Sequence, residues 1–275
     1  LKAAPLNKTT LSPRKKPLNI PTRVVLDVIP SKKSFTSFTL KTITPRVEIN
    51  IPKFYIDFDN QSNRDAAKDL KTEIERLKEQ GIKGLVIDLR NNGGGALKTV
   101  VDMAGMFIKN GPVVQVKYFD KEKQVLSDRD RSILWTGPLV ILVNEGSASA
   151  SEILAAAMQD YKRAIIIGGN QTWGKGTVQN VLDLNRMVKN NTNGDLGALK
   201  FTTQKYYRIN GGSTQLEGVK SDIVVPNRYT YVDFGEKDQE NPLKWDKIDP
   251  VSYKPVSYTH LRAHETREDR GRPGG

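Results

Sequence analysis

The sequence predicts an α/β protein with a mixed, largely parallel core sheet. Nearly continuous apolar runs such as 84–89 and 138–143 are separated by segments with helical periodicity. A strand that is apolar on both faces is typical of a parallel sheet, because helices cover both of its sides. Strands that alternate with helices are the pattern of an α/β domain. The 275 residues leave room for one large domain and a smaller piece.

The N-terminal stretch differs from the rest of the chain. Residues 1–22 are rich in Pro, Lys and Thr and predict irregular structure. The alternating runs 23–29 and 37–43 predict two strands of a small β unit, and 49–58 predicts another strand pair or a bend. The pattern of the main domain, in which helices alternate with buried strands, begins only after this stretch.

The helical pattern begins at about residue 63. Leu70, Ile74 and Leu77 mark one face of a helix over 63–80, and Gly81 supplies its C-terminal stop. A second helix follows the NNGGG turn at 91–95, and its apolar face carries Leu97, Val100, Val101, Ala104, Phe107 and Ile108. A third helix is predicted over 149–163. Further strands are predicted at 84–89, 112–119, 138–143, 164–168, 177–184 and 198–209.

The formal charge of +12 is spread unevenly, with eleven Lys and Arg against two acids in residues 1–56. Such a segment can attract nucleic acid or anionic lipid. It lacks interleaved aromatic residues and any recognisable binding module, so a solvated basic face is favoured and no nucleic-acid partner is expected. No apolar run reaches the ~18 residues that span a bilayer, so no transmembrane segment is expected here.

The absence of cysteine narrows the possible chemistry, as does the position of both histidines, His260 and His264, near the C-terminus. Residues 255–275 resemble a translated cloning adapter more than a protein domain, and we predict that they are non-native. The rest of the chain therefore excludes a Ser-His-Asp triad, a thiol nucleophile and a His-ligated zinc, and we expect no metal or cofactor. If Ser149 is a nucleophile, its base is a lysine, and Lys175 is the best placed.

The motif GSASASE at 146–152 follows a strand and opens a helix. A serine at a helix N-terminus lies beside unpaired N–H groups that can stabilise an oxyanion. The alternative is a capping box, with Ser149 as the N-cap and Glu152 reaching back. The motif alone leaves both interpretations open and favours capping.

The motif GKGTVQ at 174–179 places Lys175 between two glycines. The preceding residues nearly match a phosphate-binding loop, but Gly176 replaces its Ser or Thr, and an alternating strand pattern follows where that loop opens a helix. An ordinary exposed turn lysine is the other alternative. A base must be neutral, whereas at a pKa of ~10.4 only about one lysine in a few thousand is neutral at pH 7. Burial without a counter-charge would lower that pKa.

The glycine run in NNGGGAL at 91–97 permits positive φ and close approach of backbones. It could supply a second oxyanion donor, the Gly94 N–H, opposite the Ala150 N–H. A tight strand-to-helix turn explains the same residues equally simply, and by itself the motif favours that explanation.

Together these motifs resemble the carboxyl-terminal processing, or tail-specific, serine proteases of bacterial envelopes. The resemblance is carried, in order, by VIDLRNNGGGAL (86–97), VILVNEGSASASEILAAAMQDY (140–161), GGNQTWGKGTVQ (168–179) and KFTTQKYYRINGGSTQLEGVKSDIVVP (200–226). It extends weakly through NPLKWDKIDPVSY (241–253), as in the longer, periplasmic subgroup.

The resemblance implies a Ser-Lys dyad. Ser149 corresponds to the nucleophile, Lys175 to its general base, and Gln179 to a residue that orients the lysine. Gly94 and Ala150 correspond to the donors of the oxyanion hole.

The resemblance also implies a domain organisation with a crotonase-like spiral protease core at 47–228. Residues 1–46 would be an irregular basic segment followed by the last strands of a truncated PDZ-like domain. Residues 229–254 would be a C-terminal extension. Because the chain begins with Leu1, we expect it to be a fragment, and its lack of a signal peptide is uninformative.

The implied activity is that of a serine endopeptidase which cleaves proteins near their C-termini in the periplasm or cell envelope. Its partners would be proteins or peptides with accessible C-termini and, as a further possibility, an adaptor protein. One alternative is a catalytically silent peptide-binding scaffold of the same fold. Another is an acyl-CoA hydratase or isomerase, but these use paired acidic groups, and only Glu152 is near the predicted site.

Overall fold

The structure is a computed structural model that describes residues 22–25, 46–57, 65–118, 121–188, 192 and 194–255. The predicted strand at 37–43 and most of the predicted non-native tail at 255–275 lie outside these residues, so both remain predictions.

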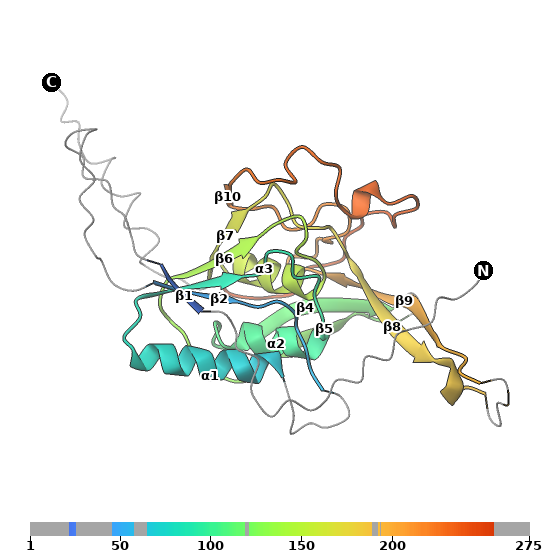
Figure 1. The fold of residues 1–275 in the computed structure, drawn as a ribbon, viewed down its shortest axis with the longest axis horizontal. Coiled ribbons are helices and arrows are strands. Elements are labelled where there is room, and N and C mark those ends of the chain that lie inside the picture. Colours follow the sequence, from blue (N-terminus) through green and yellow to red (C-terminus); the bar gives the residue numbers. More distant parts are fainter. Residues whose placement is uncertain are drawn as a thin grey trace.

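The larger sheet has six strands in the order β1-β2-β3-β6-β7-β10 (Figure 1). Its strands are β1 (Thr22–Val25), β2 (Arg46–Asn50), β3 (Gly84–Asp88), β6 (Leu139–Val143), β7 (Ile165–Gly168) and β10 (Ile223–Val224). All neighbours pair in parallel except β1 and β2, which are antiparallel. The predicted α/β class with a largely parallel core sheet is confirmed.

A second sheet of four strands is antiparallel, in the order β5-β4-β9-β8. It consists of β4 (Gly111–Tyr118), β5 (Gln124–Asp128), β8 (Thr177–Asp183) and β9 (Ala198–Tyr207). Strands were predicted close to β4, β8 and β9, but their separation into a second sheet was not predicted, and β5 was missed. The partly exposed side chains of β5 give no apolar run that would reveal it. In Figure 1, β8 and β9 extend away from the body as a two-stranded arm.

In the described part of the chain, three α-helices join the strands: α1 (Ala66–Glu79), α2 (Leu97–Gly105) and α3 (Ala150–Asp160). Helix α1 begins at Asp65, whose carboxylate accepts a hydrogen bond from the Ala67 N–H at 2.8 Å, as an N-cap does. Leu70, Ile74 and Leu77 are buried, as the helical spacing predicts. Two short 3₁₀ turns, η1 (Leu184–Arg186) and η2 (Glu236–Asp238), lie in the later segments.

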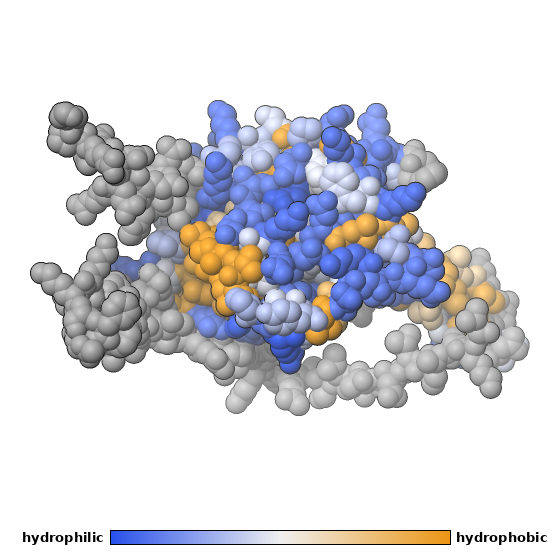
Figure 2. All heavy atoms as spheres, turned by 90° about the horizontal axis from the view of Figure 1, so that it is seen from above, coloured by the Kyte–Doolittle hydropathy of each residue, from blue (hydrophilic) through white to orange (hydrophobic). Residues whose placement is uncertain are grey.

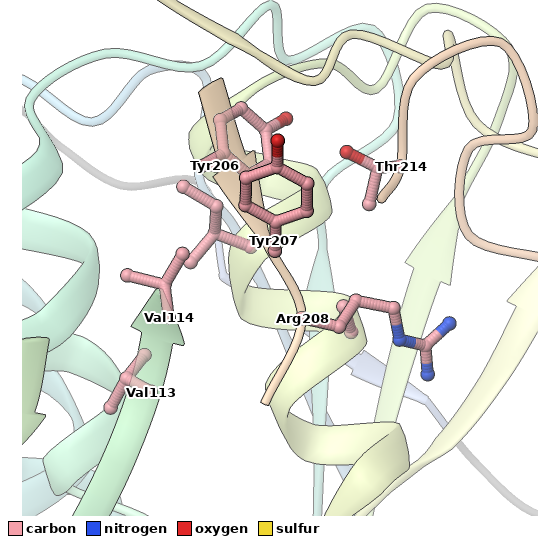
Figure 3. A pocket seen from close by; sticks show the side chains of 8 residues that line it. Val113, Val114, Tyr206, Tyr207, Arg208 and Thr214 are labelled. Carbon is pink, nitrogen blue, oxygen red and sulfur yellow. The ribbon is translucent and has the colours of Figure 1, made fainter. Parts of the chain in front are cut away.

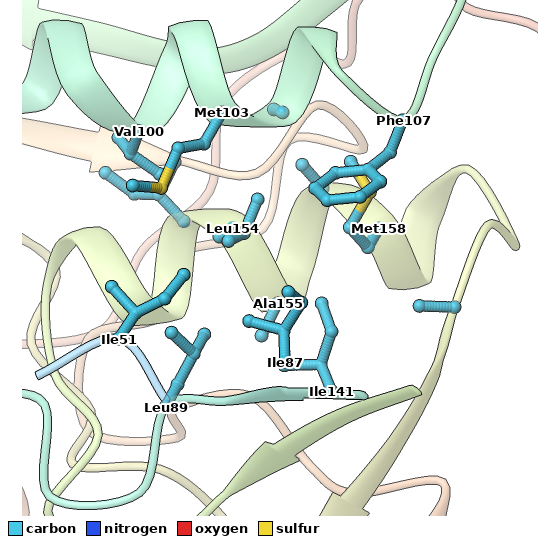
Figure 4. Packing of buried hydrophobic residues seen from close by; sticks show 14 of the residues in the cluster. Ile51, Ile87, Leu89, Val100, Met103, Phe107, Ile141, Leu154, Ala155 and Met158 are labelled. Atoms are coloured by element: carbon cyan, nitrogen blue, oxygen red, sulfur yellow. The ribbon is translucent and has the colours of Figure 1, made fainter. Parts of the chain in front are cut away.

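Helix α3 lies at the centre of the core, with every residue from Ala150 to Met158 buried. Figure 4 shows α2 packed on one side of it, and the β3 and β6 residues Ile87 and Ile141 on the other. A helix that is buried on all sides needs apolar side chains all round, and small ones where its neighbours approach closely. This explains the run ILAAAM at 153–158. The N-terminus of α3 is therefore held rigidly by the core.

The segment after β10 returns over the core with little regular structure. The Ile248 N–H donates to the Gly211 carbonyl at 2.9 Å, and the Trp245 indole N–H donates to the Ser213 carbonyl at 3.0 Å. The surface in Figure 2 is mostly hydrophilic, with separate hydrophobic patches. Among the described residues, no helix combines the length and the apolar character needed to cross a membrane.

Candidate active site

The serine turn, residues 146–152, connects β6 to α3. The buried Ser147 hydroxyl donates to the Leu89 carbonyl at 2.8 Å, and the buried Ser151 hydroxyl donates to the Asn92 carbonyl at 2.8 Å. These two serines tie the turn to the end of β3. Ser149, between them, is only partly buried, so it is the serine of the motif that remains accessible.

The backbone of Ser149 is strained, with φ 58° and ψ −112°. Non-glycine residues rarely adopt this conformation, and such strain concentrates at functional sites. A strained strand-to-helix turn is also how the nucleophile elbow of α/β-hydrolases exposes its serine. The Ser149 N–H donates to the Glu152 carboxylate at 2.8 Å, so the predicted reach of Glu152 back to the cap is present.

Gly94 packs directly against the serine turn. A Cβ at this position would lie 2.8 Å from Ser149 Cβ and 3.0 Å from the Ala150 nitrogen, and its φ of +101° also favours glycine. Of the two predicted oxyanion donors, the Ala150 N–H has no hydrogen bond within the described part of the chain. The Gly94 N–H donates to the Asn92 side-chain oxygen at 2.8 Å.

The lysine turn, residues 173–176, is enclosed by the loop that follows β9. The Lys175 carbonyl accepts hydrogen bonds from the Tyr206 hydroxyl and from the Thr214 hydroxyl, the latter at 2.9 Å. A Cβ at Gly176 would lie 2.8 Å from Gln215 Cβ, so the close approach requires glycine. Strand β8 follows the turn directly, which removes the phosphate-binding-loop interpretation, because that loop opens a helix.

The Lys175 side chain is half-buried, and its Nζ donates to Gln179 Oε1 at 3.1 Å. Burial lowers the pKa of Lys175, and the nearby cation Lys200 lowers it further. Among the described residues, no hydrogen bond joins Lys175 Nζ to Ser149 Oγ. The structure thus pairs Lys175 with Gln179 and brings the backbones of the two turns together.

Glu152 is the residue that joins the two turns. Its Oε2 accepts the N–H of Ser149 at 2.8 Å and the N–H of Lys175 at 3.1 Å. Its Oε1 accepts the Gly174 N–H at 2.7 Å and the Thr172 hydroxyl at 2.6 Å. Sequence reasoning found only the local bond to Ser149, because the other partners lie twenty or more positions along the chain.

Glu152 is fully buried, and burial raises its pKa to about 7 although the hydrogen bonds from its donors oppose the shift. A single carboxylate oxygen within hydrogen-bonding distance of both amides fixes the spacing of the serine and lysine backbones. Glu152 can therefore act as a rigid spacer between them.

Tyr206 also supports the contact between the serine turn and the lysine turn. It is buried, and burial raises its pKa well above the usual value, so its hydroxyl stays protonated and can donate. The ring lines a small hollow between α3 and the second sheet, together with Val113, Val114, Ile153, Ala156, Tyr207, Arg208 and Thr214. In Figure 3, the β4 valines lie on one side of this hollow, and Thr214 and Arg208 lie on the other.

The far end of α3 carries a separate ion pair. Asp160 accepts hydrogen bonds from the Arg208 guanidinium, the shorter at 2.6 Å, and from the Asn210 side chain at 3.0 Å. These contacts brace the helix end against the strand that carries Tyr206.

Comparison with known proteins identifies the class. The model of peptidase family S41 matches residues 48–225, and the chain belongs to this family. The model for the C-terminal domain of tail-specific protease matches residues 229–269. The resemblance to carboxyl-terminal processing proteases seen in the sequence is confirmed.

Named relatives agree. The tail-specific protease of Haemophilus influenzae is 46% identical over 208 residues, which cover 76% of this chain and 28% of the relative. The carboxy-terminal-processing protease of Bartonella bacilliformis is 34% identical over 244 residues, covering 83% of this chain and 50% of the relative. The chain thus spans between about a quarter and a half of these proteins.

Solved structures share the fold. The photosystem II D1 C-terminal processing protease superimposes with a TM-score of 0.58 at 28% identity, over 77% of this chain and 50% of that one. Mature CPAF superimposes with a TM-score of 0.56 at 13% identity, over 74% of this chain and 50% of that one, a likeness of fold alone.

Proposed function

We propose that this chain carries the catalytic core of a serine endopeptidase that cleaves proteins near their C-termini in the bacterial cell envelope, with Ser149 as nucleophile and Lys175 as general base. The observation that carries the proposal is the shared carboxylate oxygen of Glu152, which accepts the amides of both residues. The membership of family S41 supports the reaction class.

In the proposed reaction, neutral Lys175 takes the proton of the Ser149 hydroxyl, and the serine oxygen attacks a peptide carbonyl carbon. The Ala150 N–H, and the Gly94 N–H once it leaves Asn92, stabilise the oxyanion. The lysine then protonates the leaving amine as the C–N bond breaks. Water hydrolyses the resulting ester to release the acid and regenerate the serine.

The lysine must change partner for this chemistry. Its Nζ is bonded to Gln179 Oε1 at 3.1 Å, and the proposal requires that a rotation of the long side chain carries it to Ser149. Catalytic hydrogen bonds are often not formed until substrate binds. Gln179 would then hold the amine in readiness, which is the orienting role that the family resemblance implied.

The peptidase reaction is tested with an unstructured C-terminal peptide and the variants Ser149→Ala and Lys175→Ala. Each should lower kcat by several orders of magnitude, up to about 10⁶-fold, because nucleophile and base act as a unit. Lys83→Ala, an exposed lysine outside the site, is the matched control and should retain full turnover. Normal hydrolysis by Lys175→Ala would refute the dyad, and a wild-type protein without hydrolysis would favour the silent peptide-binding scaffold.

The acyl-CoA alternative receives no support from the site. Such enzymes need acidic groups that face the substrate, whereas both oxygens of Glu152 are occupied by backbone and hydroxyl donors. Glu152 is also completely buried. An acyl-CoA turnover assay should therefore give no activity above background.

A further inference from the structure

The C-terminal segment, residues 229–254, contacts the lysine turn through Glu236. The Trp173 indole N–H donates to Glu236 Oε2 at 2.9 Å, and the Glu236 N–H donates to the Trp173 carbonyl at 2.8 Å. Both the backbone and the side chain of Glu236 are thus joined to the residue two positions before Lys175.

The other oxygen of Glu236 reaches the opposite side of the turn. Gln215 Nε2 donates to Glu236 Oε1 at 3.3 Å, and Gln215 Oε1 accepts the Gly176 N–H at 2.8 Å. Gln215 is fully buried and so cannot exchange these partners for water. Gln215 Nε2 also donates to the Leu243 carbonyl at 3.1 Å, another residue of the C-terminal segment. Glu236 therefore contacts Trp173 directly and reaches Gly176 through Gln215, on the two sides of Gly174 and Lys175.

Apolar packing and a second anchor keep the C-terminal segment in place. The rings of Trp173 and Phe234 pack edge to face with their centroids 5.0 Å apart, and the ring of Phe234 stacks on that of Tyr229 with centroids 4.9 Å apart. Just before this segment, the Asn227 side chain donates to the Glu145 carboxylate at 2.8 Å, next to the serine turn. The chain between residues 227 and 236 is thus attached beside both turns.

We propose that Glu236 is a positioning residue for Lys175, supplied by the C-terminal segment and acting through Trp173 and Gln215 on the two flanks of the lysine turn. Its catalytic consequence rests on the proposed function of Lys175. The C-terminal segment is then a working component of the peptidase site.

Glu236 also contributes to the charge around the amine. The titratable groups that bear on Lys175 are Lys200 on β9, which lowers its pKa, Glu236 on η2 and Glu152 on α3, which both raise it, and Tyr206, which stays neutral. The neutral amine is the active base, so kcat/KM rises with pH through the pKa of Lys175. Removing the charge of Glu236 should lower that pKa and move the acidic limb of the profile to lower pH.

The experiment compares Glu236→Gln, Glu236→Ala and the matched control Glu240→Gln in the intact protein. Glu240 is an exposed acid in the same segment. Glu236→Gln should move the acidic limb of kcat/KM to lower pH, and Glu236→Ala should lower kcat about 10- to 100-fold with KM nearly unchanged. Glu240→Gln should alter neither quantity.

A direct titration separates this proposal from the proposed function. The pKa of Lys175 is measured by NMR after ¹³C-dimethylation of lysines, with its signal assigned by its loss in Lys175→Ala. It should fall in Glu236→Gln even if the protein hydrolyses no peptide. If Glu236→Ala fails to fold, Trp173→Phe removes the indole donor and should also lower kcat. Two results together would overturn the proposal. The first is that the pKa of Lys175 is the same in Glu236→Gln and in Glu240→Gln. The second is that kcat is unchanged in whichever of Glu236→Ala and Trp173→Phe folds.

Discussion

The serine turn and the lysine turn are held by different means. The serine turn is anchored in the core, because it connects strand β6 to helix α3 and both elements are packed there. The lysine turn lies between the two sheets. Its N–H groups donate to the side chains of Glu152 and Gln215, and its Lys175 carbonyl accepts from the hydroxyls of Tyr206 and Thr214. The turn that carries Ser149, the proposed nucleophile, is therefore held mainly by the packed core, and the turn that carries Lys175, the proposed base, mainly by a polar network. The two turns should respond differently to substitution.

The largest effect is expected where the two halves meet. Glu152→Gln replaces one of the two accepting oxygens with an NH₂ group. In one orientation of the amide this group faces the Ser149 and Lys175 N–H groups, and in the other it faces the Gly174 N–H and the Thr172 hydroxyl. Each unsatisfied buried donor costs about 1–3 kcal/mol, so we expect a loss of about 2–4 kcal/mol in the free energy of unfolding, measured with urea. Peptide hydrolysis should fall at least about 100-fold, because both turns shift.

Glu75→Gln is the control for this change, since Glu75 lies on the exposed side of α1. It should change the free energy of unfolding by less than about 0.5 kcal/mol. Equal stability of Glu152→Gln and Glu75→Gln would show that the two turns are held independently of Glu152.

The serine side can be disturbed alone through Gly94→Ala. The added Cβ would lie 2.8 Å from both Ser149 Cβ and the Ala148 carbonyl oxygen, so the serine turn must move. We expect about 1–3 kcal/mol of destabilisation, as for other overpacked sites, and a fall in kcat that exceeds the change in KM. Circular dichroism melting and steady-state kinetics measure the two effects.

The neighbouring Gly93→Ala provides the comparison, because a Cβ there meets nothing within 4 Å. It should retain activity and stability close to wild type. If both variants behave alike, the contact between Gly94 and the serine turn has no influence on catalysis.

The difference between the turns also explains how far the sequence could predict the site. Strands, helices and the accessible Ser149 follow from local signals: apolar runs, the 3.6-residue period and small residues around a strand-to-helix turn. The roles of Ser147 and Ser151 were missed, because their partners Leu89 and Asn92 lie more than fifty residues away. The support of Lys175 was missed for the same reason. Tyr206 reads as an ordinary strand residue, and only the folded chain places its hydroxyl on the Lys175 carbonyl.

The lysine side can be disturbed alone through Tyr206→Phe, which removes a buried hydroxyl and retains the ring. The Lys175 carbonyl keeps its bond from Thr214, so we expect a loss of about 1 kcal/mol in the free energy of unfolding. If Lys175 is the base, as proposed, a fall in kcat of about 10-fold should accompany it, because displacing the base slows the chemical step.

Tyr207→Phe tests whether that fall is local. The Tyr207 hydroxyl donates to Asp246 at 3.1 Å, away from the lysine turn. Removing it should leave kcat unchanged at a similar cost in stability. A comparable fall in kcat for both variants would mean that Tyr206 acts through general loosening of β9.

The smallest effect concerns charge alone. Lys200 is exposed on β9, and its positive charge lowers the pKa of Lys175. Lys200→Gln should therefore raise that pKa and move the acidic limb of the kcat/KM profile to higher pH, opposite in direction to Glu236→Gln. Because ions screen exposed charges over about 8 Å at physiological ionic strength, the difference from wild type should shrink as salt is added.

Lys83→Gln is the control, because it removes an equal charge outside the site. If the acidic limb of the kcat/KM profile lies at the same pH in both variants, the charge of Lys200 does not act on Lys175. A shift that survives high salt would instead mean that the substitution moves the backbone of the lysine turn, which would place this side of the site under the control of β9 geometry rather than of charge.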